Sequence, residues 1–179
     1  MVTTTDNNPK VYCGTYGKYN NGSIAGKWMD LTEYEDAEEF FKACSEVHKN
    51  EHDPEFMFQD YECFPRSMYS ECMGTEDVER LIEFAKLDED QREYVAEYLD
   101  EVDSNADIDS IEDYYIGNIN DIKGDSFMSN DEAYGYYCVE NGLIDVPEHL
   151  QNYFDYESYG SEQLQDIHVT ESGHMFQNY

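Results

Sequence analysis

Residues 88–102, DEDQREYVAEYLDEV, predict a helix with one apolar and one acidic face. Asp88 is a side-chain N-cap, and Gln91 three residues later completes a capping box. The apolar face follows helical spacing and consists of Tyr94, Val95, Tyr98, Leu99 and Val102. The opposite face consists of Glu89, Asp90, Glu93, Glu97, Asp100 and Glu101. Like charges three and four residues apart destabilise an isolated helix, so selection for stability alone does not account for this face.

The residues on the N-terminal side predict a small sheet covered by one helix. Strand-forming residues occur at 11–16, 24–31 and 55–61, and a Gly- and Asn-rich loop at 17–22 separates the first two strands. Residues 36–49 have apolar side chains at helical spacing. A three-stranded sheet with one helix is therefore expected near the N-terminus.

Further elements are expected on both sides of the acidic helix. Residues 75–85 predict the preceding helix, with Thr75 as its N-cap. The last third predicts a mixture of elements: a strand at 114–119, helices at 130–141, 147–153 and 155–165, and a hairpin formed by 167–170 and 175–179.

These elements predict an α+β fold in an elongated chain of three small domains. Each group is too small to surround one large central core. The expected division is a disordered lead-in at 1–9, an N-terminal α+β domain at 10–64, a central helical domain at 65–105 and a C-terminal α+β domain at 106–179.

The composition is strongly acidic but typical of a folded protein. The chain has 42 Asp and Glu against 10 Lys and Arg, a formal net charge of −32. Disordered acidic chains are usually poor in aromatic residues, whereas here 15% of residues are aromatic and 40% are hydrophobic. Such a surface repels nucleic acid and anionic membranes and attracts basic clefts.

The sequence predicts a cytoplasmic protein. Residues 1–10 lack the apolar segment of a signal peptide, and no apolar run is long enough to span a membrane. The cysteines are odd in number and contain no C-x-x-C pair, which favours reduced thiols; they are Cys13, Cys44, Cys63, Cys72 and Cys138.

Two patterns leave metal-dependent alternatives open. His48, Glu51 and His52 match the H-x-x-E-H zinc pattern of a hydrolase, although the helix should end there, and a solvated helix end is the simpler interpretation. Residues 101–112 can be aligned with a calcium loop, with ligand positions at Glu101, Asp103, Asn105, Asp107, Asp109 and Glu112. However, Ala106 stands where such a loop needs glycine. Otherwise we expect no catalytic residues, cofactor or bound metal, and calcium binding is the alternative function.

The charge itself suggests imitation of DNA. Duplex DNA carries about one negative charge per 1.7 Å, so a dimer of this chain, with a charge of −64, corresponds to about 110 Å of DNA. Surface carboxylates could satisfy the cations of a DNA-binding groove while offering no base edges.

Two segments resemble the ArdA-type antirestriction proteins. The first is TYGKYNNGSIAGKWMDL at 15–31, extended by FMFQDY at 56–61, and the second is PEHLQNYFDYESYG at 147–160. The motif positions are Tyr19, Asn20, Asn21, Gly22, Gly26, Trp28, Pro147, Leu150, Tyr153, Asp155, Tyr156, Glu157 and Gly160. The order and spacing are similar from about residue 11 to residue 176.

The resemblance implies a non-enzymatic homodimer that imitates bent B-form DNA and blocks type I restriction–modification enzymes. It also implies carriage by mobile elements and three domains in line, with the dimer contact in the last. The expected target is the DNA groove of the methyltransferase–specificity core. The candidate phosphate-mimicking carboxylates are Glu89, Asp90, Glu93, Glu97, Asp100, Glu101, Asp103, Asp107, Asp109, Glu112 and Asp113.

Overall fold

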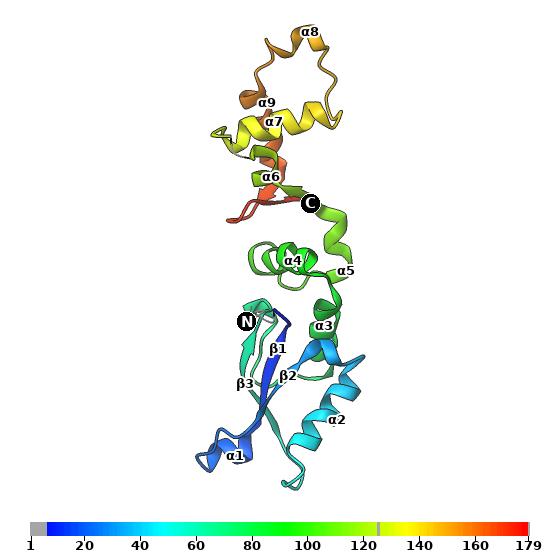
Figure 1. Cartoon of the computed structure of the whole chain (residues 1–179), viewed down its shortest axis with the longest axis vertical. Coiled ribbons are helices and arrows are strands. Elements are labelled where there is room, and N and C mark those ends of the chain that lie inside the picture. The colour runs from blue at the N-terminus through cyan, green and yellow to red at the C-terminus, as the bar shows by residue number, and fades with distance from the viewer. Residues whose placement is uncertain (1–6, 125, 179) are drawn as a thin grey trace, which may run out of the picture. The chain divides into compact units, whose positions relative to one another are not determined.

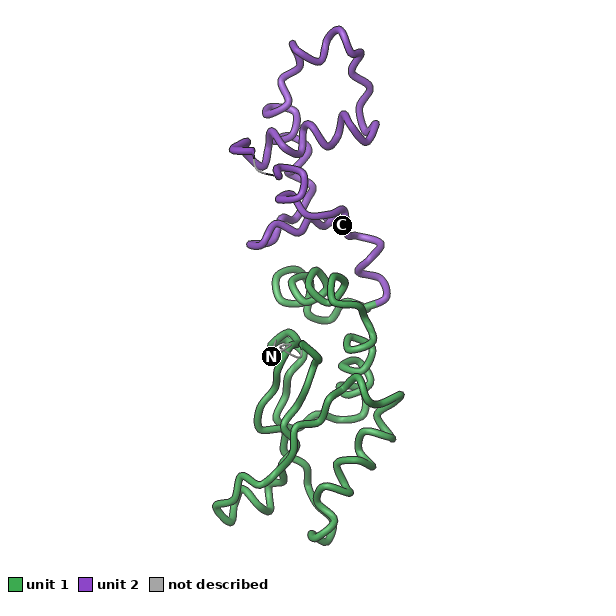
Figure 2. Tube along the Cα trace, viewed as in Figure 1, with its two compact units in different colours: residues 1–108 green, residues 109–179 purple. Residues whose placement is uncertain are grey.

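The computed structural model describes residues 7–124 and 126–178 and divides into two compact units, residues 1–108 and 109–179 (Figure 2). The first unit combines the expected N-terminal and central domains, and the arrangement in three domains stays a prediction. Residues 1–6 of the expected lead-in lie outside the described residues. Its last three residues make contacts: Asn7 donates to Glu89, Asn8 donates to Asp30 at 2.8 Å, and the carbonyl of the buried Pro9 accepts from the Leu31 N–H.

The first unit contains the predicted three-stranded sheet. The strands β1 (Lys10–Thr15), β2 (Lys27–Asp30) and β3 (Phe56–Glu62) are antiparallel in the order β2-β1-β3. Helix α2 (Ala37–Val47) lies beside the sheet (Figure 1). Its rings pack on β3, with centroid distances of 5.9 Å for Phe40–Phe58 and 6.1 Å for Phe41–Phe56. The predicted sheet with one helix is therefore confirmed.

The segment between β1 and β2 differs from the prediction. The expected loop begins with a short helix, α1 (Tyr16–Asn20), because the Thr15 side chain accepts a hydrogen bond from the Lys18 N–H and caps it. The expected strand at 24–31 is shortened to β2. The Tyr12 hydroxyl donates to the Ile24 carbonyl and accepts from the Gly26 N–H, so a side chain replaces strand pairing there.

Two helices complete the first unit after the short turns η1 (Leu31–Glu33) and η2 (Arg66–Met68). They are α3 (Thr75–Lys86) and α4 (Glu89–Glu101). The capping box of Asp88 and Gln91 is confirmed. Two details of the prediction were wrong. Gly74, not Thr75, is the N-cap of α3, and Val102 is 40% exposed because α4 ends one residue before it.

The second unit is built on another antiparallel sheet. Its strands are β4 (Tyr115–Asn118), β5 (Ile167–Val169) and β6 (His174–Gln177), in the order β4-β6-β5, which confirms the predicted hairpin. The helical elements of this part of the chain are α5 (Ile108–Ile111), η3 (Glu112–Tyr114), α6 (Ile119–Lys123), α7 (Asn130–Glu140), α8 (Glu148–Gln151), α9 (Tyr156–Gln163) and η4 (Leu164–Asp166).

The core of the second unit lies between its sheet and α7. Its buried residues include Ile119, Ala133, Tyr134, Cys138 and Met175. Burial raises the pKa of Tyr134 to about 12, so its hydroxyl is neutral at physiological pH. The short helices α5 and α6 were not predicted, because four or five residues are too few to establish a helical period. None of the helices in the described residues is long and apolar enough to cross a membrane.

Candidate functional site

Helix α4 presents a dense row of carboxylates. Tyr94, Val95, Tyr98 and Leu99 bury its opposite face, as predicted. Five of its six acidic residues are exposed and Glu97 is half-buried. Thirteen residues at a rise of 1.5 Å span about 20 Å, which gives one carboxylate per about 3 Å. A single DNA strand has nearly the same density, about one charge per 3.4 Å.

The N-terminal segment anchors one end of α4. Asn7 donates from its side chain to Glu89 at 2.9 Å. The basic residue of α4, Arg92, donates to the backbone carbonyls of Asn7 at 3.2 Å and Asp88 at 3.4 Å. At the other end, Asp100 accepts from the Ser67 hydroxyl at 2.7 Å. These contacts fix the helix so that its acidic face stays exposed.

The remaining candidate carboxylates follow α4 and fall in both units. Asp103 and Asp107 belong to the first unit, whereas Asp109, Glu112 and Asp113 belong to the second. All five are exposed. Each unit therefore contributes exposed carboxylates, and their continuity as one surface stays a prediction.

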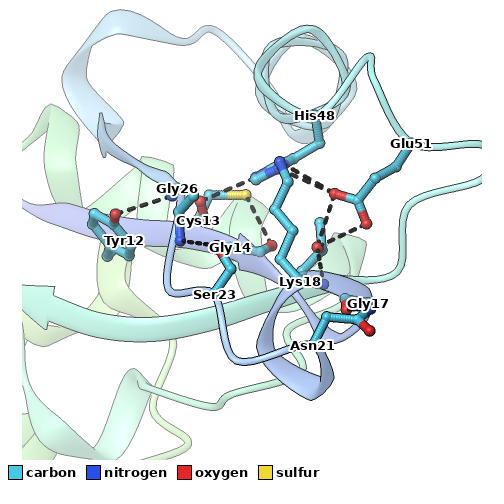
Figure 3. Close-up of polar contacts among 12 residues, drawn as sticks. Tyr12, Cys13, Gly14, Gly17, Lys18, Asn21, Ser23, Gly26, His48 and Glu51 are labelled. Atoms are coloured by element: carbon cyan, nitrogen blue, oxygen red, sulfur yellow. Dashed lines mark hydrogen bonds and ion pairs between the residues drawn. The ribbon is translucent and has the colours of Figure 1, made fainter.

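His48 is not at a solvated helix end, as the simpler interpretation assumed. Its side chain is fully buried, whereas His52 is exposed. In Figure 3, His48 lies between the Cys13 carbonyl, 3.1 Å from Nε2, and the Lys18 ammonium, 2.6 Å from Nδ1. An ammonium group can only donate, so Nδ1 accepts and Nε2 carries the proton. Burial, and secondarily the Lys18 charge, lowers the pKa of His48 and keeps the ring neutral.

Glu51 completes this partly buried network as a hydrogen-bond acceptor. Its carboxylate accepts from the Thr15 hydroxyl at 3.0 Å. It also pairs with the Lys18 ammonium at 3.2 Å (Figure 3). These hydrogen bonds and the Lys18 charge lower the pKa of Glu51 despite partial desolvation. The network joins α1 to the end of α2, so two residues of the zinc pattern, His48 and Glu51, have a structural role, and His52 takes no part in it.

The metal-dependent alternatives gain no support from the structure. Within residues 7–124 and 126–178, no group of three or more His, Cys, Asp or Glu side chains is placed to hold a metal ion. In the calcium-like segment, the Asp103 carboxylate accepts from the Asn105 N–H at 2.9 Å.

The first family motif positions the loop between β1 and β2. A Cβ on Gly26 would lie 2.3 Å from the Cys13 carbonyl oxygen, so only glycine fits beside β1. Trp28 meets the Tyr12 ring edge-on, with centroids 5.5 Å apart. Gly22 has a φ of +78°, in the left-handed region that favours glycine. Tyr19 is 53% exposed and available for contacts.

The second motif fixes the crossing of α7 and α9. Pro147 is the N-cap of α8, and the Asp155 side chain caps α9 by accepting from the Ser158 N–H. Tyr156 stacks on Tyr136 with centroids 3.8 Å apart. Gly160 is buried where the helices cross.

Sequence reasoning missed the glycine partner in this crossing. A Cβ on Gly135 would lie 2.0 Å from the Tyr156 carbonyl oxygen, so α9 approaches α7 backbone to backbone there. The available signal was an isolated glycine inside a helical pattern.

Comparison with known proteins decides the family. The family model described as antirestriction protein (ArdA) matches residues 11–176. The chain belongs to the ArdA family. None of the curated proteins with which the chain was compared matches it. ArdA proteins are DNA mimics that inhibit type I restriction enzymes without catalysing a reaction, which confirms the function expected from the charge and the two motifs.

Proposed function

We propose that the carboxylates of α4, together with those that follow it, replace DNA phosphates in the groove of a methyltransferase–specificity core. The observation that carries this proposal is the row on α4, with one carboxylate per about 3 Å. Lysine and arginine side chains that neutralise phosphates would pair with these carboxylates. The helix offers no base edges, so it would compete with DNA of any sequence.

The proposed imitation is distributed over many weak pairs. A solvent-exposed ion pair contributes about 0.2–1 kcal/mol and is weakened by salt. Tight binding therefore requires that many pairs form together. The excess of 42 acidic over 10 basic residues supplies many such partners.

The finer proposal is that the protein acts as a homodimer through its second unit. Three large apolar side chains between α7 and α9 are exposed: Leu143 by 62%, Leu150 by 47% and Tyr153 by 86%. Leu150 and Tyr153 are motif positions that cap no helix and fill no core. A second copy of the chain would cover these side chains, and contacts of this type stabilise dimers.

Block neutralisation tests the role of α4. The variant carries Asp90→Asn, Glu93→Gln, Glu97→Gln and Glu101→Gln, which leaves the two carboxylates that anchor the helix unchanged. At about 0.5 kcal/mol per exposed pair, the loss of four pairs predicts about thirtyfold weaker inhibition of a type I methyltransferase core.

The matched control removes four exposed carboxylates elsewhere in the first unit, namely Glu33, Glu38, Glu62 and Glu83, each changed to Gln. Both variants lose the same charge, so long-range attraction falls equally. We expect the control to weaken inhibition by much less. Equal weakening by the two variants would exclude a special role for α4.

A further inference from the structure

An open cavity of about 560 Å³ in the first unit has aromatic walls. It lies at the three-stranded sheet and the loops beside it, and its aromatic and acidic lining residues include Tyr12, Tyr19, Trp28, Asp60, Tyr69 and Glu71. Tyr19 and Trp28 are motif positions, so the first family motif builds part of this wall. None of the residues that line the cavity is Lys, Arg or His.

Contacts with the backbone hold the aromatic walls in place. The Tyr12 hydroxyl bonds the backbone of both Ile24 and Gly26 at 3.0 Å. Across the cavity lining, the Tyr69 hydroxyl donates to the Phe58 carbonyl at 2.6 Å. Because the rings are positioned before any ligand binds, binding loses little conformational entropy.

Charge determines which ligand suits this cavity. Asp60 and Glu71 line it and are exposed, and Asp60 accepts one hydrogen bond from the Tyr61 N–H at 2.9 Å. The nearby Arg66 lies over the Tyr69 ring, 5.0 Å from its centroid, but it is not among the lining residues, so no lining cation balances the two carboxylates. A neutral apolar ligand would desolvate these carboxylates without giving them a partner, which is unfavourable. A cation would be attracted both by the carboxylates and by the rings of Tyr12, Tyr19 and Trp28, whereas Tyr69 already stacks on Tyr61 and has Arg66 over its ring.

We propose that this cavity receives an arginine side chain of the restriction enzyme. A guanidinium group is planar, stacks on aromatic rings and forms two parallel hydrogen bonds with a carboxylate, whereas the compact ammonium of lysine does neither. The cavity thus adds one local, arginine-selective contact to the distributed pairing of carboxylates. The assignment of the arginine to the restriction enzyme rests on the proposed function, whereas the affinity of the cavity for a guanidinium group does not.

Binding of a small probe tests the chemistry independently of any restriction enzyme. Trp28 is the only tryptophan of the chain, so its fluorescence reports directly on the cavity. We expect Nα-acetylarginine amide to change the emission of the full-length protein saturably, and Nα-acetylcitrulline amide, its neutral counterpart, to have little effect. The double variant Asp60→Asn/Glu71→Gln should abolish the arginine response. An absent response, or an equal response to citrulline, would overturn the proposal.

Inhibition of a type I methyltransferase core tests the role of the cavity. Relative to the double variant Glu38→Gln/Glu83→Gln, which loses the same charge outside the cavity, Asp60→Asn/Glu71→Gln should inhibit about tenfold less well. Tyr19→Ala, which removes a half-exposed wall without touching the core, should weaken inhibition in the same direction. Equal inhibition by the two double variants would contradict the proposal. Failure of the unaltered protein to inhibit would instead contradict the proposed function. The fluorescence titration would still show whether the cavity binds a guanidinium group.

Discussion

Gly160 of α9 lies against Gly135 of α7 so closely that a Cβ on Gly160 would be 2.7 Å from the Gly135 nitrogen and 1.8 Å from the Asp131 carbonyl oxygen. The reciprocal Cβ on Gly135 would meet the Tyr156 carbonyl at 2.0 Å. All three obstacles are backbone atoms, which cannot move aside as the end of a flexible side chain can. Helices α7 and α9 therefore pack this closely only because neither has a side chain at the point of contact.

Gly160→Ala should destabilise the second unit. Alanine favours a helix over glycine by about 1 kcal/mol, but the clash separates α7 from α9 and should outweigh this gain. We expect a net loss of about 2 kcal/mol in the free energy of unfolding, measured by urea denaturation. Ser161→Ala, an exposed change in the same helix, is the control and should leave stability nearly unchanged.

His48 should make stability depend on pH. Its folded pKa lies below the ordinary value of 6.5, so the unfolded chain binds a proton first as pH falls. The contribution of the neutral, buried His48 to the free energy of unfolding is fully present above about pH 6.5. It decreases as pH falls through that value towards the folded pKa, by at most about 1.4 kcal/mol per pH unit. Unfolding measured between about pH 7.5 and 5.5 should show a shallower dependence for His48→Gln.

The control for this titration is His52→Gln, because His52 is exposed. It should retain the pH dependence of the unaltered protein. If His48→Gln retained that dependence as well, the titration would have to be assigned to another group.

Glu97→Gln alone should change inhibition little. The charge of one carboxylate is a small part of the charge of a chain with 42 acidic residues, so its loss should weaken binding less than tenfold, or about 1.4 kcal/mol. Inhibition constants of this variant and the unaltered protein, measured side by side, check the prediction. A larger loss would reveal a local hot spot on α4 and argue against distributed pairing.

Tyr153→Glu should shift the proposed dimer towards monomer. Tyr153 is 86% exposed, and a charge buried there between two copies would lack a partner. Sedimentation velocity across a concentration series measures the shift. Val102→Glu places the same charge at an exposed apolar position of the first unit and should leave association unaltered. Identical sedimentation of all three proteins would remove this surface from the proposed interface.

The sequence predicted elements whose signals are local and repeated. The helix of residues 88–102 was recognisable because its capping box and its apolar spacing agree, and the structure confirms the box and four of the five apolar positions, Val102 excepted. The first sheet was recognisable from strand-forming residues and its covering helix. The charge and the two motifs identified the function.

The sequence could not predict features that depend on distant contacts. His48 looked solvated because nothing nearby in the chain shows that Cys13 and Lys18 surround it. β2 begins at Lys27, and not at residue 24, because the Tyr12 hydroxyl bonds the backbone of Ile24 and Gly26. The aromatic cavity collects residues from three separated segments, so no single motif contains it.

The most direct test of the central claim is competition between the protein and duplex DNA for a type I methyltransferase core. It is performed at two salt concentrations, with calcium and zinc chelated. The account predicts that the protein displaces DNA without metal, and that its own affinity for the core falls steeply at the higher salt concentration, because paired charges are screened and ions are no longer released favourably. Displacement with an affinity independent of salt, or none at either concentration, would contradict electrostatic imitation of DNA.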